Sequence, residues 1–417
     1  MGPQPDLAAR LTTPEAAIEA ALDLSGPTPT PIDVPQPSGD QPDVRAIIPP
    51  IVWWIEQMRT SSRLIEERLT WFWHDHFATA VSKVRVPYLM YRQHLTLREH
   101  ATGNFATLLK AIARDPAMII YLDGISNRAD NVNENFGREC LELFTLGKDA
   151  VYTQEDVVAM SRASTGWLVK IPGRARLSLL PGAPYDAVFA PQLHDPATVT
   201  LLGATGAFDL DGALDVILAR PETARFVAGK LHRELTGLDA DTETTERLGA
   251  QFGADYEILG LVRAITAEPA FLSQAAFRSR VRTPVEKLVA LLQATATPAS
   301  AGRTTRGGRK QGMGAASGDG GLFALRALGY VPFNPPNVGG YPKGSRLLGP
   351  HQLVHAFDLL GAVAGPPPEA VDPDVEPLFA RLGVYDVSDS TRRTVAAERD
   401  PARRFALAFA SPEVVLT

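Results

Sequence analysis

The 417-residue chain has little cysteine, no long apolar run and no excess of positive charge, and each shortage excludes a class of protein. Its single cysteine, Cys140, cannot form an internal disulfide, so a reducing cytosol is the expected compartment. The longest strongly apolar run, Ile47–Ile55, contains two prolines and is far shorter than the roughly 20 residues that span a bilayer. The first residues lack the basic stretch and apolar core of a signal peptide. We therefore expect a cytoplasmic protein without a membrane segment.

Charge and motif content narrow the function further. The 41 basic and 47 acidic side chains leave a net charge of −6, which argues against nucleic acid or an acidic membrane surface as a partner. Hydrophobic residues (45 %) and charged residues (21 %) are in the proportions of a folded soluble protein. The motifs GxxxxGK[ST], HExxH, GxSxG and CxxC are all missing, which excludes the simple forms of a P-loop nucleotidase, a zincin and an α/β-hydrolase.

Local patterns predict a mainly α protein, one large irregular helical domain with a small β-rich insertion. Residues 1–43 are expected to hold a short helix capped by Thr13 and then a proline-rich linker. Residues 44–417 are expected to form the helical domain. Within it, short β-favouring runs separated by proline and glycine predict the insertion at about 166–206. The glycine-rich, basic window at about 302–321 predicts a flexible loop.

Ionisable and aromatic side chains are most concentrated in the segment WFWHDHF, at the end of a predicted amphipathic helix. His74 and His76 are candidate ligands for a divalent transition metal, because neutral imidazole is a common metal ligand. Residues two apart on a helix point about 200° away from each other, so both can bind one ion only if the helix ends there. The alternative is that His76 belongs to the apolar stripe and is hydrogen-bonded to a neighbouring element.

A second polar segment, NENFGRECLE, predicts a helix capped by Asn133. Asn135, Glu139 and Glu142 are spaced to share one face of that helix. If this face points inward, the two carboxylates are candidates for a metal site or an acid–base pair. If it points outward, it is a solvated surface with a weak ion pair between Arg138 and Glu142.

Two further features are weaker indications of a functional site. His194 and Asp195 precede a proline in the β-rich insertion, where a turn-forming aspartate is the commoner interpretation. Cys140 lies beside Phe136 and Phe144 on the apolar face of its helix, which is typical of an inert core thiol.

These segments resemble the bacterial family catalogued as domain of unknown function 1800. That family has a Trp-His-x-His-Phe block, an Asn-Glu-Asn-Phe-x-Arg-Glu block and a His-Asp pair before Leu-Gly, and all three occur here in order. The later segment FNPPNVGGYPKG resembles a fourth block, with Tyr341 where the family usually has tryptophan. The family's opening His-Leu-Leu-Arg-Arg block is missing, and Val199-Thr200 stands where a lysine is common. The resemblance implies a largely helical fold. Members are often encoded beside a sulfatase- or phosphatase-like companion, which implies such a partner.

Two functions remain open from the sequence. The first is a metal-dependent hydrolase or oxidoreductase with a site where the three blocks meet. In that enzyme, the metal ligands would be His74, His76 and His194. Glu139 would be a further ligand or the general base, and Asp195 would hold the tautomer of a ligating histidine. The side chains that orient the substrate or the ligands would be Asn133, Asn135 and Glu142. The second is a non-catalytic binding or scaffold protein, in which the same residues form a structural polar network and a partner protein docks on 332–344.

Overall fold

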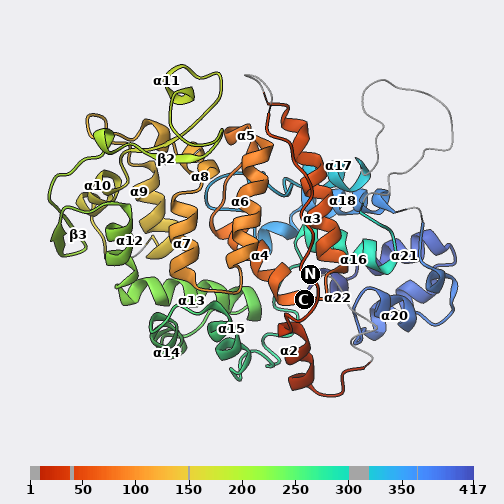
Figure 1. Ribbon diagram of the computed structural model, residues 1–417. Helices are drawn as coiled ribbons and strands as arrows, with labels where there is room; N and C mark the ends of the chain where they lie inside the picture. The colour runs from red at the N-terminus through yellow and green to blue at the C-terminus, as the bar shows by residue number, and fades with distance from the viewer. Residues whose placement is uncertain (1–9, 38–41, 149–150, 300–318, 364) are drawn as a thin grey trace.

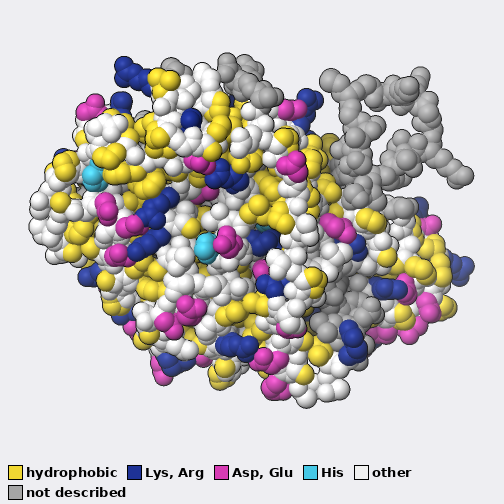
Figure 2. All heavy atoms as spheres, in the orientation of Figure 1, with side chains coloured by type: hydrophobic (Ala, Val, Ile, Leu, Met, Phe, Trp, Pro, Cys, Tyr) yellow, Lys and Arg dark blue, Asp and Glu magenta, His cyan; other side chains and the backbone are white. Residues whose placement is uncertain are grey.

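The computed structural model describes residues 10–37, 42–148, 151–299, 319–363 and 365–417 (Figure 1). Over these ranges the protein is mainly α, as predicted, and its strands form two short hairpins. None of the helices described there combines the length and apolar character needed to cross a membrane. Acidic and basic side chains are interspersed over the face shown in Figure 2, so the net charge of −6 is not concentrated in one area of that face.

The centre of the molecule is a group of long helices that pack side by side (Figure 1). Its members are α3 (Ile48–Thr60), α4 (Leu64–His76), α6 (Pro87–His100), α7 (Phe105–Ala113) and α16 (Pro284–Ala294). Helix α4 occupies the range that the apolar spacing predicted, and Leu69, Phe72 and Trp73 on its stripe are buried. Because almost every side chain of α4 is buried, its polar residues must find partners within the protein.

The segment before α3 follows the central helices closely. Thr13 caps α2 (Pro14–Leu22) as predicted, its side chain accepting a hydrogen bond from the Ala16 N–H. The proline-rich stretch that follows is extended, and the Trp53 indole donates to the Thr30 carbonyl at 3.0 Å. Short elements complete this half of the core: η1 (Val44–Ile47), α5 (Val81–Val84), α8 (Pro116–Tyr121) and η2 (Gly124–Ser126).

The β structure lies inside the interval 166–206, where the sequence predicted it. Strand β1 (Trp167–Val169) pairs antiparallel with β2 (Ala187–Phe189), and β3 (Val199–Leu201) pairs antiparallel with β4 (Ala204–Gly206). The neighbouring helices are α10 (Gln154–Ala163), α11 (Ala175–Ser178) and η4 (Pro191–Leu193). Helix α10 begins with a capping box between Thr153 and Asp156.

The remaining helices form two groups. Below the central helices in Figure 1 lie α13 (Pro221–Thr236), α14 (Thr242–Gly253) and α15 (Ile258–Thr266), and α12 (Leu210–Leu218) lies to the left of the central helices. The later elements are α17 (Asp319–Ala327), η5 (Gly344–Leu348), α18 (Pro350–Ala356), η6 (Phe357–Ala362), η7 (Pro368–Val371), α19 (Glu376–Arg381), α20 (Asp389–Ala397), α21 (Pro401–Phe409) and α22 (Pro412–Val415). Because α17 begins at Asp319, the predicted glycine-rich loop ends earlier than expected, and the rest of it lies outside the described residues.

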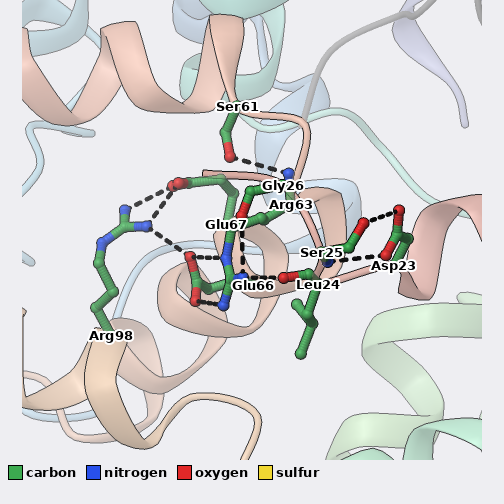
Figure 3. A network of polar contacts seen from close by, with 9 residues as sticks. All are labelled: Asp23, Leu24, Ser25, Gly26, Ser61, Arg63, Glu66, Glu67 and Arg98. Carbon is green, nitrogen blue, oxygen red and sulfur yellow. Dashed lines mark hydrogen bonds and ion pairs between the residues drawn. The ribbon is translucent and has the colours of Figure 1, made fainter. Parts of the chain in front are cut away.

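A buried ionic network holds the chain's early residues against α4 and α6 (Figure 3). The Arg98 guanidinium donates to both carboxylate oxygens of Glu67, at 2.6 and 2.7 Å, and to Glu66 at 3.3 Å. Arg63 pairs with Glu66 at 2.7 Å and also donates to the carbonyls of Leu24 and Gly26. Every charge in this network therefore has an opposite charge beside it, as buried ions require.

Candidate functional site

His74 is a buried, neutral acceptor near the end of α4. Its Nε2 accepts a hydrogen bond from the Phe333 N–H at 3.1 Å and lies 3.4 Å from the Tyr341 hydroxyl. Since a backbone N–H can only donate, this contact places the ring proton on Nδ1. Burial lowers the pKa of His74 to about 4, against a smaller opposing effect of Asp75. His74 thus fixes the segment around Phe333.

Asp75, which the sequence analysis did not select, holds the Pro-Pro-x-Val-Gly-Gly-Tyr segment in place. Its Oδ1 accepts from the Tyr341 N–H at 2.7 Å, and its Oδ2 pairs with the Lys343 ammonium at 2.5 Å. Gly340 has φ +89°, and a Cβ there would overlap Asp75 Oδ1. Only glycine allows the loop to lie this close to the carboxylate in that backbone conformation.

His76 holds a different element. Its ring donates from Nε2 to the Phe144 carbonyl at 3.0 Å, which agrees with the alternative that His76 is a core histidine bonded to a neighbouring element. The buried Nδ1 has no hydrogen-bond partner among the described residues. Burial, together with the positive charge of Lys230, keeps the pKa of His76 well below its ordinary value. Although α4 does end at His76, the two rings face different elements.

The element that His76 contacts is a π-helix. Helix α9 (Asn135–Glu139) continues directly into η3 (Cys140–Thr145), which has π geometry and ends before Gly147 at φ +94°. The sequence predicted one ordinary helix here, because a π segment of only six residues is too short for its wider turn to be recognised in the apolar pattern. Cys140 is fully buried, and burial raises the pKa of its thiol to about 12, as expected for an inert core cysteine. Short π segments are found frequently at functional sites.

A cavity of about 440 Å³ lies between this π-helix and the segment that Asp75 holds. Glu139, Glu142 and Leu143 line one side together with Lys148. The other side is formed by residues 336–342 and Arg346. The cavity is therefore bounded by two of the blocks named above, and the His74–His76 block anchors both of its walls.

The two carboxylates in the cavity have different surroundings. Glu142 lies 3.2 Å from the Lys148 ammonium, not beside Arg138, which pairs with Glu134 instead. Glu139 is partly buried and has no ion-pair partner among the described residues. Burial raises the pKa of Glu139, and the negative charge of Glu142 adds to the effect. The face of this helix points neither into the core nor fully to solvent but onto the cavity.

Lys230, on α13, is a further charged group that the sequence analysis missed, and it contacts the π-helix without lining the cavity. Its ammonium lies 3.5 Å from the carbonyl of Leu143, a lining residue, and 5.2 Å from the centre of the Phe226 ring. Burial lowers the pKa of Lys230 to about 7, and the positive charge of Lys343 acts in the same direction. No local motif identifies Lys230, because it is one polar position of an ordinary amphipathic helix.

Asn133 and Asn135 hold the turn that leads into α9. The prediction that Asn133 caps this helix is wrong, because Glu134 occupies the N-cap position and no side chain caps the helix there. The Asn133 side chain accepts from the Asn135 N–H at 3.0 Å, and its own N–H donates to the Asn127 side chain at 2.8 Å. The Asn135 amide donates to Asp123 at 2.8 Å. Both side chains thus support the position of α9.

The His194–Asp195 pair lies at the end of α10. His194 Nδ1 is 3.2 Å from the Thr165 hydroxyl, and the Asp195 N–H donates to the same hydroxyl at 2.8 Å. Asp195 also accepts from the Ala197 N–H at 3.0 Å, the turn expected before a proline. In the described part of the chain, no three His, Cys, Asp or Glu residues are grouped so that they could hold a metal ion. The contacts of His74, His76 and His194 thus bring them to three separate places.

Comparison with known proteins supplies a family and no closer relative. No curated protein and no solved structure matches the chain. Residues 3–416 match the family described as Protein of unknown function (DUF1800), which is essentially the whole chain and includes every segment that bounds the cavity. The largely helical fold that the resemblance implied is also the fold observed. The protein belongs to the DUF1800 family.

Proposed function

We propose that the cavity between η3 and residues 336–346 is the active site of an enzyme that acts on a small acidic molecule, with Glu139 as its general acid–base group. The observation that supports this is convergence. Two segments far apart in the sequence, NENFGRECLELF and PPNVGGYPKG, line this charged hollow together, and a third, WFWHDHF, bonds to both of them. A volume of about 440 Å³ suits a small metabolite.

The chemistry proposed for Glu139 follows from its difference from Glu142. Glu142 is paired with Lys148 at 3.2 Å. Glu139 lacks such a partner among the described residues, and burial raises its pKa, which favours the protonated form that a general acid needs.

Lys148 and Arg346 supply the proposed recognition of the substrate. Both line the cavity, and both side chains are exposed enough to meet a ligand from solvent. A carboxylate or phosphate is the ligand group that an ammonium and a guanidinium bind most favourably. In this proposal a bound anion draws Lys148 away from Glu142.

The histidines have a positioning role in this proposal. His74 and His76, with Asp75 between them, bind the two walls of the cavity to one helix end. A divalent metal bound by His74, His76 and His194 stays a prediction from the sequence, and metal analysis of the purified protein tests it. A sulfatase- or phosphatase-like companion likewise stays a prediction.

The scaffold alternative draws on one specific observation. All three residues His74, Asp75 and His76 bond to backbone groups, which is typical of a network that fixes the packing of helices. This alternative accounts for the network but not for Glu139, Lys148 and Arg346, which face a hollow instead of one another.

Ligand-observed NMR tests the proposal with defined probes. The probes are succinate, lactate and pyruvate, with uncharged glycerol as the comparison. We expect the three acids to bind the wild-type protein and to lose at least tenfold in affinity in Lys148→Ala/Arg346→Ala. The matched control is Lys110→Ala/Arg247→Ala, which removes two cations from ion pairs with Asp215 and Glu268 elsewhere. Equal binding by both double variants would contradict the proposed site.

A further inference from the structure

A second cavity, of about 400 Å³, lies in another part of the molecule, and none of its described lining residues belongs to the Glu139 cavity. It is bounded by α5 and the turn after it, by α8 and η2, and by the segment that follows β1. Helices α5 and α8 and the β1–β2 hairpin lie close together in the upper half of Figure 1. Such a volume is in the range of small-molecule binding sites. Most of its lining is aliphatic, including Val84, Val86, Ile120, Ile125, Ile171 and Pro172.

The charged residues among its described lining are all cations, namely Lys83, Arg85 and Arg174, and all three are exposed. The Lys83 ammonium pairs with Asp123 at 2.8 Å. Arg85 and Arg174, by contrast, have no ion-pair partner in the described part of the chain. Acidic side chains outnumber basic ones in the whole sequence, 47 to 41, so a cavity whose charged lining is only positive departs from the average. Two guanidinium groups are thus left to bind an anion.

Unusual backbone conformations gather at the same cavity. Of the eight non-glycine residues with positive φ in the described chain, Arg85 (+61°) and Tyr185 (+66°) line it, and Asp123 (+59°) holds Lys83 beside it. Residues with a Cβ rarely adopt this left-handed conformation. It persists where the surrounding structure enforces it, and such positions cluster at functional sites. This observation is independent of the charge and points to the same place.

We propose that the second cavity binds an alkyl carboxylate, a ligand that the Glu139 site does not require. Arg85 and Arg174 bind its carboxylate, because a planar guanidinium matches a carboxylate in charge and shape. The aliphatic lining buries its chain, which removes apolar surface from water. A short dicarboxylate lacks such a chain, so the two cavities select different acids.

Isoleucine methyl NMR of the full-length protein tests the proposal with octanoate as the probe. We expect saturable shifts of the Ile120, Ile125 and Ile171 signals, because these side chains line the cavity. The signals of Ile258 and Ile265, which are buried on α15, should not shift. Signals of the three lining isoleucines that do not respond to octanoate would overturn the proposal.

Two further probes divide the ligand into its parts on the wild-type protein. Acetate has the charge without the chain, and 1-octanol has the chain without the charge. Each should bind about tenfold or more weakly than octanoate, since each lacks one of the two interactions. Binding of either probe as tightly as octanoate would overturn the proposal. This comparison needs no variant, so a misfolded protein cannot obscure it.

A double variant tests the two arginines. In Arg85→Asn/Arg174→Ala both guanidinium groups are removed, and asparagine tolerates the left-handed conformation at position 85. We expect octanoate affinity to fall about tenfold or more, with the unfolding temperature near that of the wild type. The matched control is Arg393→Ala/Arg403→Ala, which removes two exposed arginines on α20 and α21 that are likewise unpaired in the described chain. Equal octanoate affinity in the two double variants would overturn the proposal.

Lys148→Ala/Arg346→Ala separates this inference from the proposed function. If octanoate shifts the three isoleucine signals equally in this variant and in the wild type, the second cavity is a site of its own, whatever the outcome at Glu139. If the variant abolishes those shifts, octanoate binds in the Glu139 cavity and the second site is overturned.

Discussion

The protein contains two clusters of charged residues that lie in opposite circumstances. In the network of Figure 3, Arg63 and Arg98 each hold a carboxylate at hydrogen-bond distance, and the carboxylates Glu66 and Glu67 are buried. Around the cavity, by contrast, Glu139 and Arg346 have no ion-pair partner among the described residues. The comparison indicates that the charges of the first cluster neutralise one another, although Arg98 Nε has no hydrogen-bond partner among the described residues, whereas the second cluster has charged groups left available for a ligand.

The largest expected effect on stability comes from a variant that disrupts the ionic network of Figure 3. Glu67→Ala leaves the Arg98 guanidinium buried beside one remaining carboxylate, so we expect a loss of about 3–5 kcal/mol in the free energy of unfolding. Urea denaturation measures this loss. Arg45→Ala, which removes an exposed partner of Asp43, is the control and should change stability little. Equal stability of Glu67→Ala and the wild type would show that the network is not structural.

The next effect concerns the histidine that fixes a wall of the cavity. The pKa of His74 is about 4 in the folded protein and near 6.5 in the unfolded chain. Between these values only the unfolded state binds the proton, so His74 should lower stability as the pH falls from 6.5, by up to about 3 kcal/mol near pH 4.

Comparison with His74→Asn isolates this effect, because asparagine can still accept from the Phe333 N–H but does not titrate. We expect a shallower loss of stability on acidification in the variant, measured by urea denaturation between pH 7 and pH 5. The oppositely signed contribution of Asp115, whose pKa burial raises to about 7, is present in both proteins and cancels. Parallel pH profiles would mean that folding does not lower the pKa of His74.

A third substitution tests the contact between Asp75, near the end of α4, and the 336–342 wall of the cavity. Gly340→Ala places a methyl group against Asp75 in a backbone conformation with φ +89°. We expect a loss of about 1–3 kcal/mol in stability and weaker binding of succinate, because the 336–342 wall must shift. Gly349→Ala, where a Cβ meets open space and φ is negative, is the control. Unchanged succinate affinity in Gly340→Ala would disconnect this wall from the site.

The smallest effect on stability should come from the cavity itself. Lys148→Ala removes an exposed ammonium from Glu142, and such a pair contributes less than about 1 kcal/mol. We expect the unfolding temperature to stay nearly constant while succinate affinity falls. A marked destabilisation without a change in affinity would place Lys148 with the structural network instead.

Much of the fold was predictable because it depends on short-range patterns. Thr13 with Pro14 starts α2, Thr153 with Asp156 starts α10, and the stripe around Phe72 gives α4 its full length. Each of these signals involves residues within a few turns of one another. The β-rich interval was likewise visible in its composition.

The cavity was predictable only in part. The family blocks identified Glu139 and the histidines, but Arg346 comes to line the same cavity as Glu139 only through long-range packing. The order of the blocks also suggested that His194 joins His74, whereas Thr165 holds His194 at the end of α10. Likewise, nothing in the local pattern showed that Glu66 and Glu67 are buried, because charged positions on a helix usually face solvent.

The measurement that tests the central claim most directly is a titration of the methyl-labelled protein with pyruvate, followed by NMR at Leu143 and Val338. These two residues line opposite walls of the cavity. Our account predicts saturable shifts of both sets of methyl signals, with those of Leu325 in the core unchanged. Methyl signals of Leu143 and Val338 that do not respond, while signals elsewhere saturate, would contradict it.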